Sequence, residues 1–264
     1  MERRFPTTVS CSRPAVREAP ERHHVSIHTS RLLQRAYVAE QTLACVLERP
    51  AGFVFGAGQY VDITLPEPRF DDALGPMRSF SMASAPGERD LLIVMRMRDS
   101  AFKRSLAEMP LGAPLLVDGP ADDLALTTGG PRPSVYLAGG VGVAPFLGAI
   151  RQAACGEGRL SATLFYSNRR PEDAAYLREL CTLAARVDGF RFIPTTTRTS
   201  DSIRSWTGES ERLSAPMLAR YLPSLVGPRY YLSGSTTFIS GMCQAIERAG
   251  VPAMDIRIEM YAGY

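Results

Sequence analysis

The fold of this chain is decided by the stretch Val135-Tyr136-Leu137-Ala138-Gly139-Gly140-Val141-Gly142-Val143-Ala144-Pro145-Phe146. Its leading apolar residues are typical of a buried parallel strand, and its glycines allow the backbone to approach a ligand closely. Pro145 suits a first helical turn, and a helix start behind glycines binds pyrophosphate. We therefore predict that Gly139, Gly140, Gly142, Val143 and Pro145 hold a nucleotide. Because Pro145 replaces the third glycine of G-x-G-x-x-G, the usual Rossmann dehydrogenase is not indicated, and a turn formed for packing alone is the alternative.

Two different patterns flank this stretch. Before it, from Arg31 to about Asp118, short β-rich runs alternate with Pro and Gly turns, which predicts an antiparallel Greek-key β-barrel with one helix at 101–109. After it, strands alternate with helices up to a last strand at 256–258, which predicts a parallel five-stranded α/β sheet with ligands at the carboxyl ends of its strands. We expect a disordered leader at 1–25, a barrel domain at 26–128 and an α/β domain at 129–264.

Composition excludes several classes of function. The net charge of +3 and the dispersed basic residues argue against nucleic acid as a partner. No apolar run approaches the length of a membrane span. The five cysteines contain no C-x-x-C pair, so we expect no metal site and a reducing, cytoplasmic location. All three histidines lie near the N-terminus, which leaves none in the body of the chain for a hydrolytic triad.

A second motif, Arg78-Ser79-Phe80-Ser81, lies on a predicted barrel strand. An arginine can clamp a phosphate with two hydrogen bonds, and an aromatic side chain offers a stacking face to a flat ring. Taken alone, the tetrapeptide also fits an edge strand with one exposed arginine. Together with the glycine-rich turn, it predicts that Arg78, Ser79, Phe80 and Ser81 bind a cofactor.

Four motifs occur in the order and spacing of the ferredoxin–NADP reductase family, which the chain resembles from about residue 30 to 264. They are Arg78-Ser79-Phe80-Ser81, the glycine-rich turn, Tyr231-Leu232-Ser233-Gly234-Ser235 with Phe238, and the terminal Glu259-Met260-Tyr261-Ala262-Gly263-Tyr264. The resemblance implies FAD on the barrel, NADPH or NADH on the α/β domain, and a C-terminal tail that lies at the flavin. No iron–sulfur segment of the C-x4-C-x2-C kind is present in the sequence.

The resemblance also implies catalytic residues. Ser81 matches the family serine near flavin N5, the atom that accepts hydride, and Glu259 resembles the near-terminal acid that positions the nicotinamide or supplies a proton. Ser233 and Gly234 stand in the family's C-G-P-P segment, so a serine replaces the cysteine at the nicotinamide. The aromatic tail resembles residues that cover the flavin, and the sequence does not decide between Tyr261 and Tyr264. A last strand with packed aromatic residues is the plainer interpretation.

Cations are expected to face the cofactor phosphates. The family's G-x-x-S/T motif, which places a helix start on the flavin pyrophosphate, aligns with Ser100-Ala101-Phe102-Lys103. Lys103 can still face phosphate from that position, although an exposed helix with a solvated lysine fits equally well. We also expect Arg96, at the end of a predicted strand, to contact a cofactor.

The choice of coenzyme depends on residues past the second α/β strand, where an acid would bond the ribose hydroxyls of NADH. Ser167, Arg169 and Arg170 lie there instead, and Arg198 follows the third strand. These residues favour NADPH, although arginines that face solvent, one of them neutralised by Asp173, also fit the sequence.

The leading hypothesis is a flavin-dependent NAD(P)H oxidoreductase that takes hydride onto FAD N5. It then passes single electrons to a separate protein, such as a ferredoxin, a Rieske protein or a haem protein. One alternative is a flavin reductase or diaphorase that acts on free flavin or small acceptors. Another, motivated by Ser100 and Ser233, is a non-catalytic nucleotide-binding subunit of a larger complex. The acceptor, the oligomeric state and the choice of FAD over FMN are left open.

Overall fold

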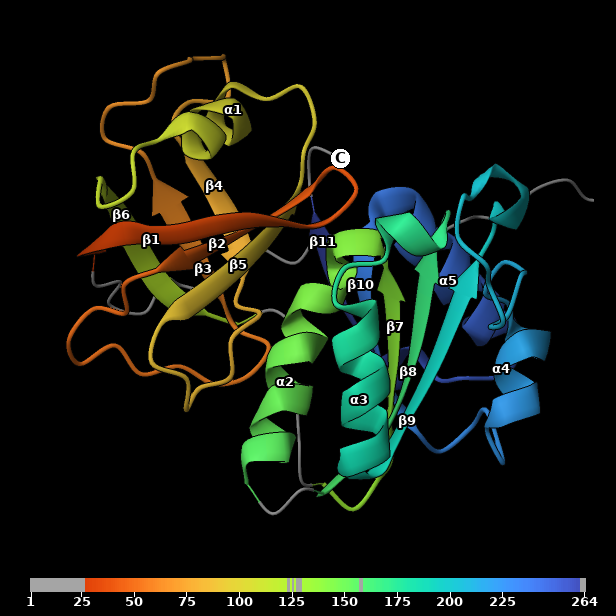
Figure 1. Cartoon of the computed structure of the whole chain (residues 1–264). Helices are drawn as coiled ribbons and strands as arrows, with labels where there is room; N and C mark the ends of the chain where they lie inside the picture. The colour runs from red at the N-terminus through yellow and green to blue at the C-terminus, as the bar shows by residue number, and fades with distance from the viewer. Residues whose placement is uncertain (1–26, 123, 125, 127–129, 157–158, 262–264) are drawn as a thin grey trace, which may run out of the picture.

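The computed structural model describes residues 27–261 except 123, 125, 127–129 and 157–158, and it shows two units side by side (Figure 1). The first unit contains α1 (Ala101–Glu108) and the strands β1 (Ile27–Ala39), β2 (Thr42–Leu47), β3 (Tyr60–Thr64), β4 (Met77–Ser81), β5 (Leu91–Arg96) and β6 (Pro114–Ala121). The predicted leader at 1–25 lies outside the described residues.

The second unit alternates strands with helices. In chain order it contains β7 (Ser134–Gly139), the 3-10 turn η1 (Gly140–Val143), α2 (Ala144–Cys155), β8 (Arg159–Asn168), η2 (Pro171–Asp173), α3 (Leu177–Arg186), β9 (Asp188–Thr196), η3 (Thr199–Asp201), α4 (Ala215–Tyr221), β10 (Arg229–Ser235), α5 (Thr236–Arg248), η4 (Ala253–Asp255) and β11 (Ile256–Tyr261). None of the helices in the described part of the chain has the length and apolar character needed to cross a bilayer.

The first unit is the predicted antiparallel barrel. Its strand order is β4-β3-β6-β1-β2-β5, so β6 returns to lie between two earlier hairpins as in a Greek key. A bridge between Met82 and Ile93 brings the two ends of the sheet together. The sequence pattern does not reveal β1, because only Ser30 and Leu32 of its thirteen residues are buried and the alternation of apolar and polar residues is lost.

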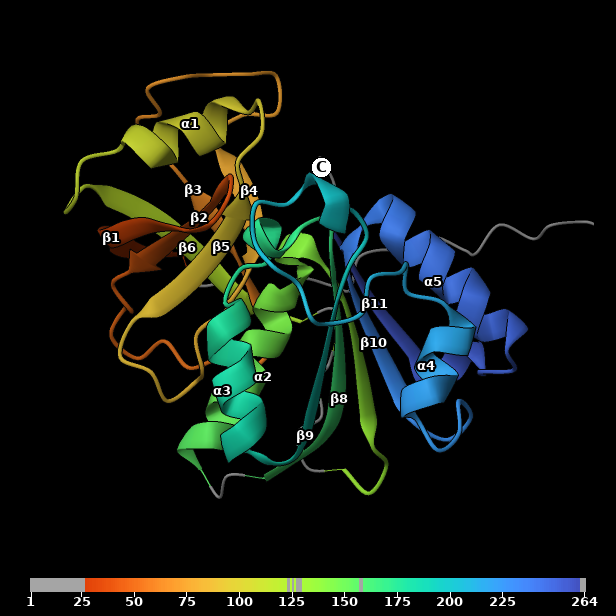
Figure 2. The ribbon, with the colours of Figure 1, turned by 45° about the vertical axis from the view of Figure 1, so that its right-hand side comes forward.

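The second unit is the predicted parallel sheet, with strand order β11-β10-β7-β8-β9. Figure 2 shows α2 and α3 on one side of this sheet and α4 and α5 on the other. The central strands are therefore covered on both faces, which explains the apolar run before the glycines. The last strand continues to Tyr261 rather than ending at residue 258, and this extension places Glu259 inside the sheet.

The glycine-rich turn folds as predicted into a strand end, a tight turn and a helix start. β7 ends at Gly139 and η1 follows. α2 then begins at Ala144, and Pro145 lies in its first turn. A Cβ atom on Gly142 would lie 2.2 Å from the carbonyl oxygen of Ser233, so only glycine allows the turn to pack on β10. The turn is thereby fixed against the strand that carries Ser233.

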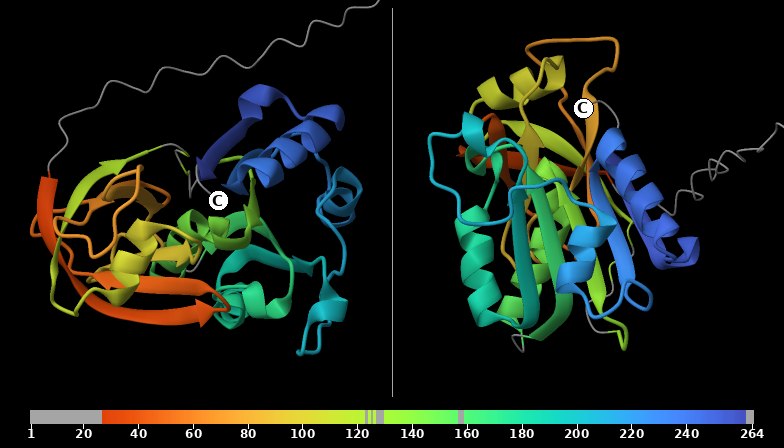
Figure 3. Two further views of the ribbon diagram at one scale, coloured as in Figure 1. Left: turned by 90° about the horizontal axis from the view of Figure 1, so that it is seen from above. Right: turned by 90° about the vertical axis from the view of Figure 1, so that its right-hand side faces the viewer.

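An apolar cluster and a backbone contact of a hairpin help to hold the units together. One apolar cluster joins Leu92 and Val94 of β5 to Phe146 and Leu147 of α2. The tip of the β1–β2 hairpin also reaches across to the second unit, as Figures 1 and 3 show, where the backbone N–H of Glu40 donates to the carbonyl of Glu172 at 2.8 Å. The boundary between the units is thus packed and hydrogen-bonded.

We expect Gly142→Ala to lower the free energy of unfolding by about 1–3 kcal/mol, because the methyl group overpacks the contact between the turn and β10. Thermal and urea unfolding measure the change. The matched control is Gly241→Ala on the exposed side of α5, where no atom lies within 4 Å of the new methyl group and the helix gains about 0.5–1 kcal/mol. Equal effects of the two substitutions would contradict the packing argument.

Candidate functional site

The three residues predicted to be catalytic meet at the boundary between the units. Glu259 of β11 lies directly beside Ser233 of β10, and Ser81 ends β4 of the barrel. The Ser81 hydroxyl donates to Glu259 Oε1 at 2.9 Å, and the Ser233 hydroxyl donates to Glu259 Oε2 at 3.0 Å. The three side chains are 3%, 0% and 5% exposed, in the order Ser81, Ser233 and Glu259. Folding therefore joins residues from both units into one buried cluster.

This cluster has a clear physical basis. A buried carboxylate is costly unless hydrogen bonds replace the water that it loses, and two hydroxyl donors supply charge-assisted bonds. Each serine hydroxyl also has lone pairs, which accept a hydrogen bond from another polar group. The cluster can therefore orient a polar group placed against it, and it can hold or release a proton at the Glu259 carboxylate.

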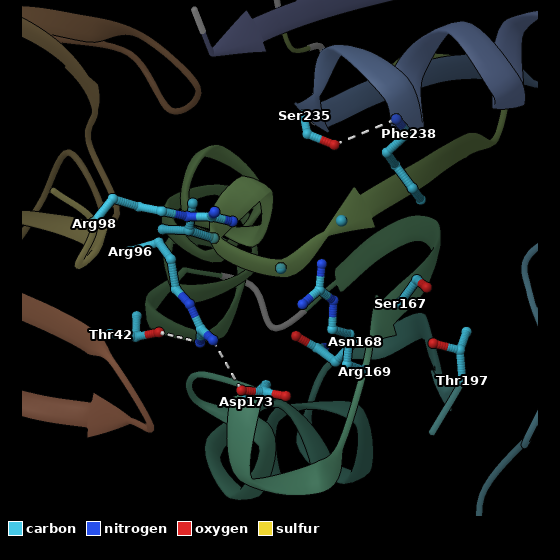
Figure 4. Close-up of a pocket in the computed structure, with 13 residues that line it drawn as sticks. Thr42, Arg96, Arg98, Ser167, Asn168, Arg169, Asp173, Thr197, Ser235 and Phe238 are labelled. Carbon is cyan, nitrogen blue, oxygen red and sulfur yellow. Dashed lines mark hydrogen bonds and ion pairs between the residues drawn. The ribbon is translucent and has the colours of Figure 1, made fainter. Parts of the chain in front are cut away.

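A pocket of about 250 Å³ opens where the parallel strands end, facing the end of β5 (Figure 4). The predicted binding residues that line it are Arg96, Gly139, Gly140, Ser167 and Arg169. Its place at the carboxyl ends of the strands is the one expected for a ligand site in a parallel sheet. Backbone N–H groups of the turn and three nearby guanidinium groups, including that of Arg98, make the pocket suited to an anion.

Four predicted residues of the two glycine-containing motifs do not line this pocket. They are Gly142, Val143, Pro145 and Gly234. Gly142, Val143 and Pro145 are buried. Gly234 lies against Gly139 and the Phe238 ring. Their predicted contact with a nucleotide stays a prediction. In the structure Gly142 packs against Ser233 of β10, and Gly234 packs against Gly139 of β7.

Eight of the thirteen residues that line the pocket are not among the predicted binding residues. The additional lining residues are Thr42, Arg98, Val141, Asn168, Asp173, Thr197, Ser235 and Phe238. Asn168 and Ser235 adjoin predicted positions, and Ser235 caps α5 by accepting from the Phe238 N–H at 3.3 Å. Thr42 and Arg98 come from the barrel, and no local pattern indicates that they face the other unit.

An ionic clasp crosses the boundary at the edge of the pocket. Arg96 of β5 donates to Asp173 at 3.1 Å, and Arg170 binds Asp173 at 3.2 Å and Glu40 of the barrel hairpin at 2.8 Å. Asp173 is only 8% exposed. Burial by itself would raise the pKa of Asp173, but the guanidinium groups of Arg170 and Arg96 hold this pKa below its ordinary value. We call this cluster of Glu40, Arg96, Arg170 and Asp173 the clasp.

Two arginines predicted to favour NADPH do not line the pocket. Arg170 is held in the clasp, so Asp173 neutralises it, as the sequence allows. Arg198 is exposed beside η3, and its backbone N–H donates to the carbonyl of Arg169 at 2.7 Å. Of the three predicted arginines past the second and third strands, Arg169 is therefore the one that faces the pocket.

The motif Arg78-Ser79-Phe80-Ser81 of the barrel lies next to α1. Arg78 pairs with Asp72 at 3.1 Å and lies over the Phe102 ring at 5.6 Å. Ser79 is exposed and donates to Asp62. Phe80 is 4% exposed and packs against Phe102 in the barrel core. Arg78 and Phe80 thus gather at α1, and the stacking role predicted for Phe80 stays a prediction.

Lys103, the one lysine of the chain, lies in the first turn of α1 and is 6% exposed. Its backbone N–H donates to the Ser100 hydroxyl at 3.4 Å, and its Nζ donates to the carbonyl of Arg96 at 2.9 Å. Burial, together with repulsion by Arg98 and Arg78, lowers the pKa of Lys103 to about 8. The alternative of a solvated lysine is therefore wrong, and three cations gather at this helix start.

Tyr261 is the last residue of β11, paired in register with Ser235. Its side chain and Tyr264 lie outside the described residues, so the choice of the ring that covers a flavin stays a prediction.

Fold and site together define a two-domain reductase, a β-barrel joined to a nucleotide-binding α/β half with a polar cluster at their boundary. Residues 136–244 match the family model of an oxidoreductase NAD-binding domain. The chain is 30% identical to ferredoxin–NADP reductase B of Sorangium cellulosum over 79% of its own length and 86% of that protein. It therefore belongs to the ferredoxin–NADP reductase family, as predicted, and is an FAD-dependent NAD(P)H oxidoreductase.

Two further similarities agree with this assignment. The chain is 26% identical to the reductase component of propane 2-monooxygenase from Mycolicibacterium smegmatis, over 77% of its own length and 58% of that protein. The fold matches the FAD/NAD-binding domain of a nitric oxide dioxygenase from Vibrio cholerae with a TM-score of 0.76, at 19% identity, over 88% of this chain and 98% of that one. The chain thus spans less than two thirds of the monooxygenase reductase and nearly all of the flavohaem-like domain.

We expect Asp173→Asn to lower the free energy of unfolding at neutral pH by about 2 kcal/mol, because hydrogen bonds to charged groups are lost and two guanidinium groups keep their charge. The pKa of Asp173 is lowered, so this stabilisation is present at neutral pH and disappears only when acid protonates the carboxylate. Urea unfolding measures it. Asp188→Asn, whose side chain is 81% exposed and 3.9 Å from Arg159, is the control and should change little. A loss at Asp173 no larger than at Asp188 would show that the clasp does not stabilise the boundary.

Proposed function

We propose that the chain carries electrons from NADPH through bound FAD to a separate acceptor protein. When bound, FAD supplies hydride acceptance at N5 and release of electrons one at a time. The observation that carries the proposal is the cluster of Ser81, Ser233 and Glu259, because it joins the barrel to the nucleotide half at one buried point. A reductase with two cofactors needs its polar positioning groups at such a boundary.

The residues at α1 fit the diphosphate of FAD. Arg78, Arg98 and Lys103 lie close enough that the two arginines depress the pKa of the lysine. Keeping a buried lysine near two like charges is unfavourable, and a bound diphosphate would relieve the repulsion. We propose that these three residues hold the diphosphate, with the N–H groups of the α1 start beside it.

The pocket fits the phosphates of NADPH. Arg169 is exposed and forms no ion pair with any residue in the described ranges, whereas Asp173, the acid in the pocket wall, is already bound by two arginines. The pocket therefore offers positive charge without a competing free carboxylate. We propose that Arg169 and Ser167 bind the 2′-phosphate, and that Arg96 and the glycine-rich turn bind the pyrophosphate.

The buried cluster would hold the nicotinamide end of the coenzyme. The Ser233 hydroxyl would hold the carboxamide, and Ser81 would fix the ring from the barrel side. The Glu259 carboxylate orients both hydroxyls and can exchange a proton at its oxygen atoms. These residues supply alignment, which is the contribution that a protein makes to hydride transfer between two cofactors.

The acceptor is proposed from the relatives. One similar protein is named a ferredoxin–NADP reductase and another a monooxygenase reductase component. We therefore propose that the electrons leave for a separate ferredoxin, Rieske protein or haem protein.

The test is an anaerobic titration of the FAD-loaded protein with NADPH and then NADH, followed by visible absorbance. We expect NADPH to bleach the flavin faster than NADH, and the reduced protein to pass electrons to ferricyanide and to a ferredoxin. In Glu259→Gln, flavin reduction should slow about 100-fold with little change in NADPH affinity, because alignment and proton exchange are lost. Glu247→Gln, on an exposed part of α5, is the matched control and should react normally.

Three outcomes would contradict the proposal. Binding of nucleotide without bleaching would favour the non-catalytic subunit. Loss of flavin during gel filtration, together with turnover of free flavin, would favour a flavin reductase. Unchanged reduction in Glu259→Gln would remove the buried cluster from the mechanism.

A separate prediction concerns Lys103. Because it is the one lysine of the chain, protein labelled with ¹⁵N-lysine should show one Nζ resonance, titrating near pH 8 in the flavin-free state. Binding of FAD should raise this pKa, since the diphosphate favours the charged form. FAD affinity should accordingly weaken as the pH rises above about 8. In Lys103→Met, FAD should bind more weakly and this pH dependence should vanish. A Lys103 pKa that FAD leaves unchanged would place the diphosphate elsewhere.

A further inference from the structure

A second groove, of about 560 Å³, lies on the far side of η2 from the nucleotide pocket, with which it shares no lining residue. We call it the Trp206 groove. Its walls include Val38 of the barrel hairpin, Tyr176 and Leu177 at the start of α3, and Trp206. Arg178 and Arg204 also line it. Its volume is in the range of sites that bind small organic molecules.

The indole of Trp206 is held in place before any ligand arrives. Its Nε1–H donates to the carbonyl of Glu209 at 2.8 Å. A Cβ atom on Gly208 would lie 2.5 Å from the indole ring, so the ring occupies the space that a side chain there would fill. Glu209 is itself tied to β9, because its carbonyl accepts from the Thr196 N–H at 2.9 Å. A ring fixed in this way loses little conformational entropy when a flat ligand packs on it.

The segment before Trp206 is anchored as well. The Glu172 carboxylate accepts from the Ser202 hydroxyl at 2.8 Å and from the Ile203 N–H at 2.9 Å. Tyr176, which also lines the groove, has a φ of 57°, which an aromatic residue seldom adopts, and the Arg151 guanidinium lies 5.3 Å from its ring centre. Both aromatic side chains thus belong to backbone segments fixed by defined contacts.

The charge of the groove is positive. Glu179, the acid in its wall, is bound by Arg151 through two hydrogen bonds of 2.6 and 2.9 Å. Arg178 and Arg204 are exposed, and within the described part of the chain neither guanidinium group forms an ion pair or a hydrogen bond. Two guanidinium groups without partners beside two aromatic side chains complement an anion that also carries a flat apolar ring.

We propose that the Trp206 groove binds an aromatic organic anion, with its ring against Trp206 and its carboxylate or sulfonate on Arg178 and Arg204. This site is independent of the nucleotide pocket, and the proposal does not rest on the function proposed above. No residue of the buried catalytic cluster lines the groove.

The test uses two probes that differ in charge, 8-anilino-1-naphthalenesulfonate and the uncharged N-phenyl-1-naphthylamine, with the FAD-saturated full chain. Trp206 is the one tryptophan of the chain, so excitation of tryptophan with emission from the probe reports binding near the groove. We expect the sulfonate to bind at least about tenfold more tightly than its uncharged analogue, as a charge-assisted contact predicts. In the double variant Arg178→Ala with Arg204→Ala, this difference should disappear.

Further variants distinguish the contribution of the Trp206 ring to probe binding from that of the arginine charges. Trp206→Phe should keep sulfonate binding and lose the sensitised emission, whereas Trp206→Ala should weaken the binding of both probes. Arg159→Ala with Arg186→Ala, two exposed arginines outside the groove, should behave as the unmodified chain. Equal affinity for the two probes, sulfonate binding that survives loss of Arg178 and Arg204, or displacement of the sulfonate by NADP⁺ would each overturn the proposal.

Discussion

The constraint on which the rest of the structure depends is the burial of the Glu259 carboxylate. A carboxylate at 5% exposure needs donors, and one of the two described here comes from the barrel while the other comes from the neighbouring strand. If the units separated, the buried Glu259 carboxylate would lose the hydrogen bond that the Ser81 hydroxyl donates. The position of the barrel on the α/β half is therefore coupled to the polar cluster that aligns the nicotinamide in the proposed mechanism.

The clasp joins the same two units through Glu40 and Arg96 of the barrel and Arg170 and Asp173 of the second unit. Its Asp173 belongs to η2, whose Pro171 lines the Trp206 groove and whose Glu172 anchors the segment leading to Trp206. One three-residue turn thus separates two pockets and contributes to the wall of each. The strand that carries Arg96 of the clasp also contributes Leu92 and Val94 to the apolar cluster with α2, so packing and ion pairs act on one interface.

A feature of the fold or the site can be predicted from the sequence when it depends on residues that are close together in the chain. The glycine-rich turn and the strand alternation could be predicted because each rests on a local pattern. Ser81, Ser233 and Glu259 could be singled out through the resemblance to a known family, but their meeting in one hydrogen-bonded cluster depends on the fold. Thr42 and Arg98 could not, because only the packing of the barrel against the second unit brings them to the pocket. The burial of Lys103 was equally hidden, since a basic residue in a first helical turn is ordinarily solvated and its cover comes from distant segments.

At the positions that depart from the family motifs, the residues of this chain still provide a helix cap, a basic group and a hydrogen-bond donor. In the predicted alignment Ser100 takes the place of a glycine and caps α1 with its hydroxyl, and Lys103 takes the place of a hydroxyl residue and brings a basic group to the same helix start. Ser233 replaces a cysteine, and a hydroxyl donates a stronger hydrogen bond to Glu259 than a thiol does. These substitutions were the reason to consider a non-catalytic subunit. Because each one keeps or strengthens an interaction at the proposed cofactor sites, they favour a working reductase instead.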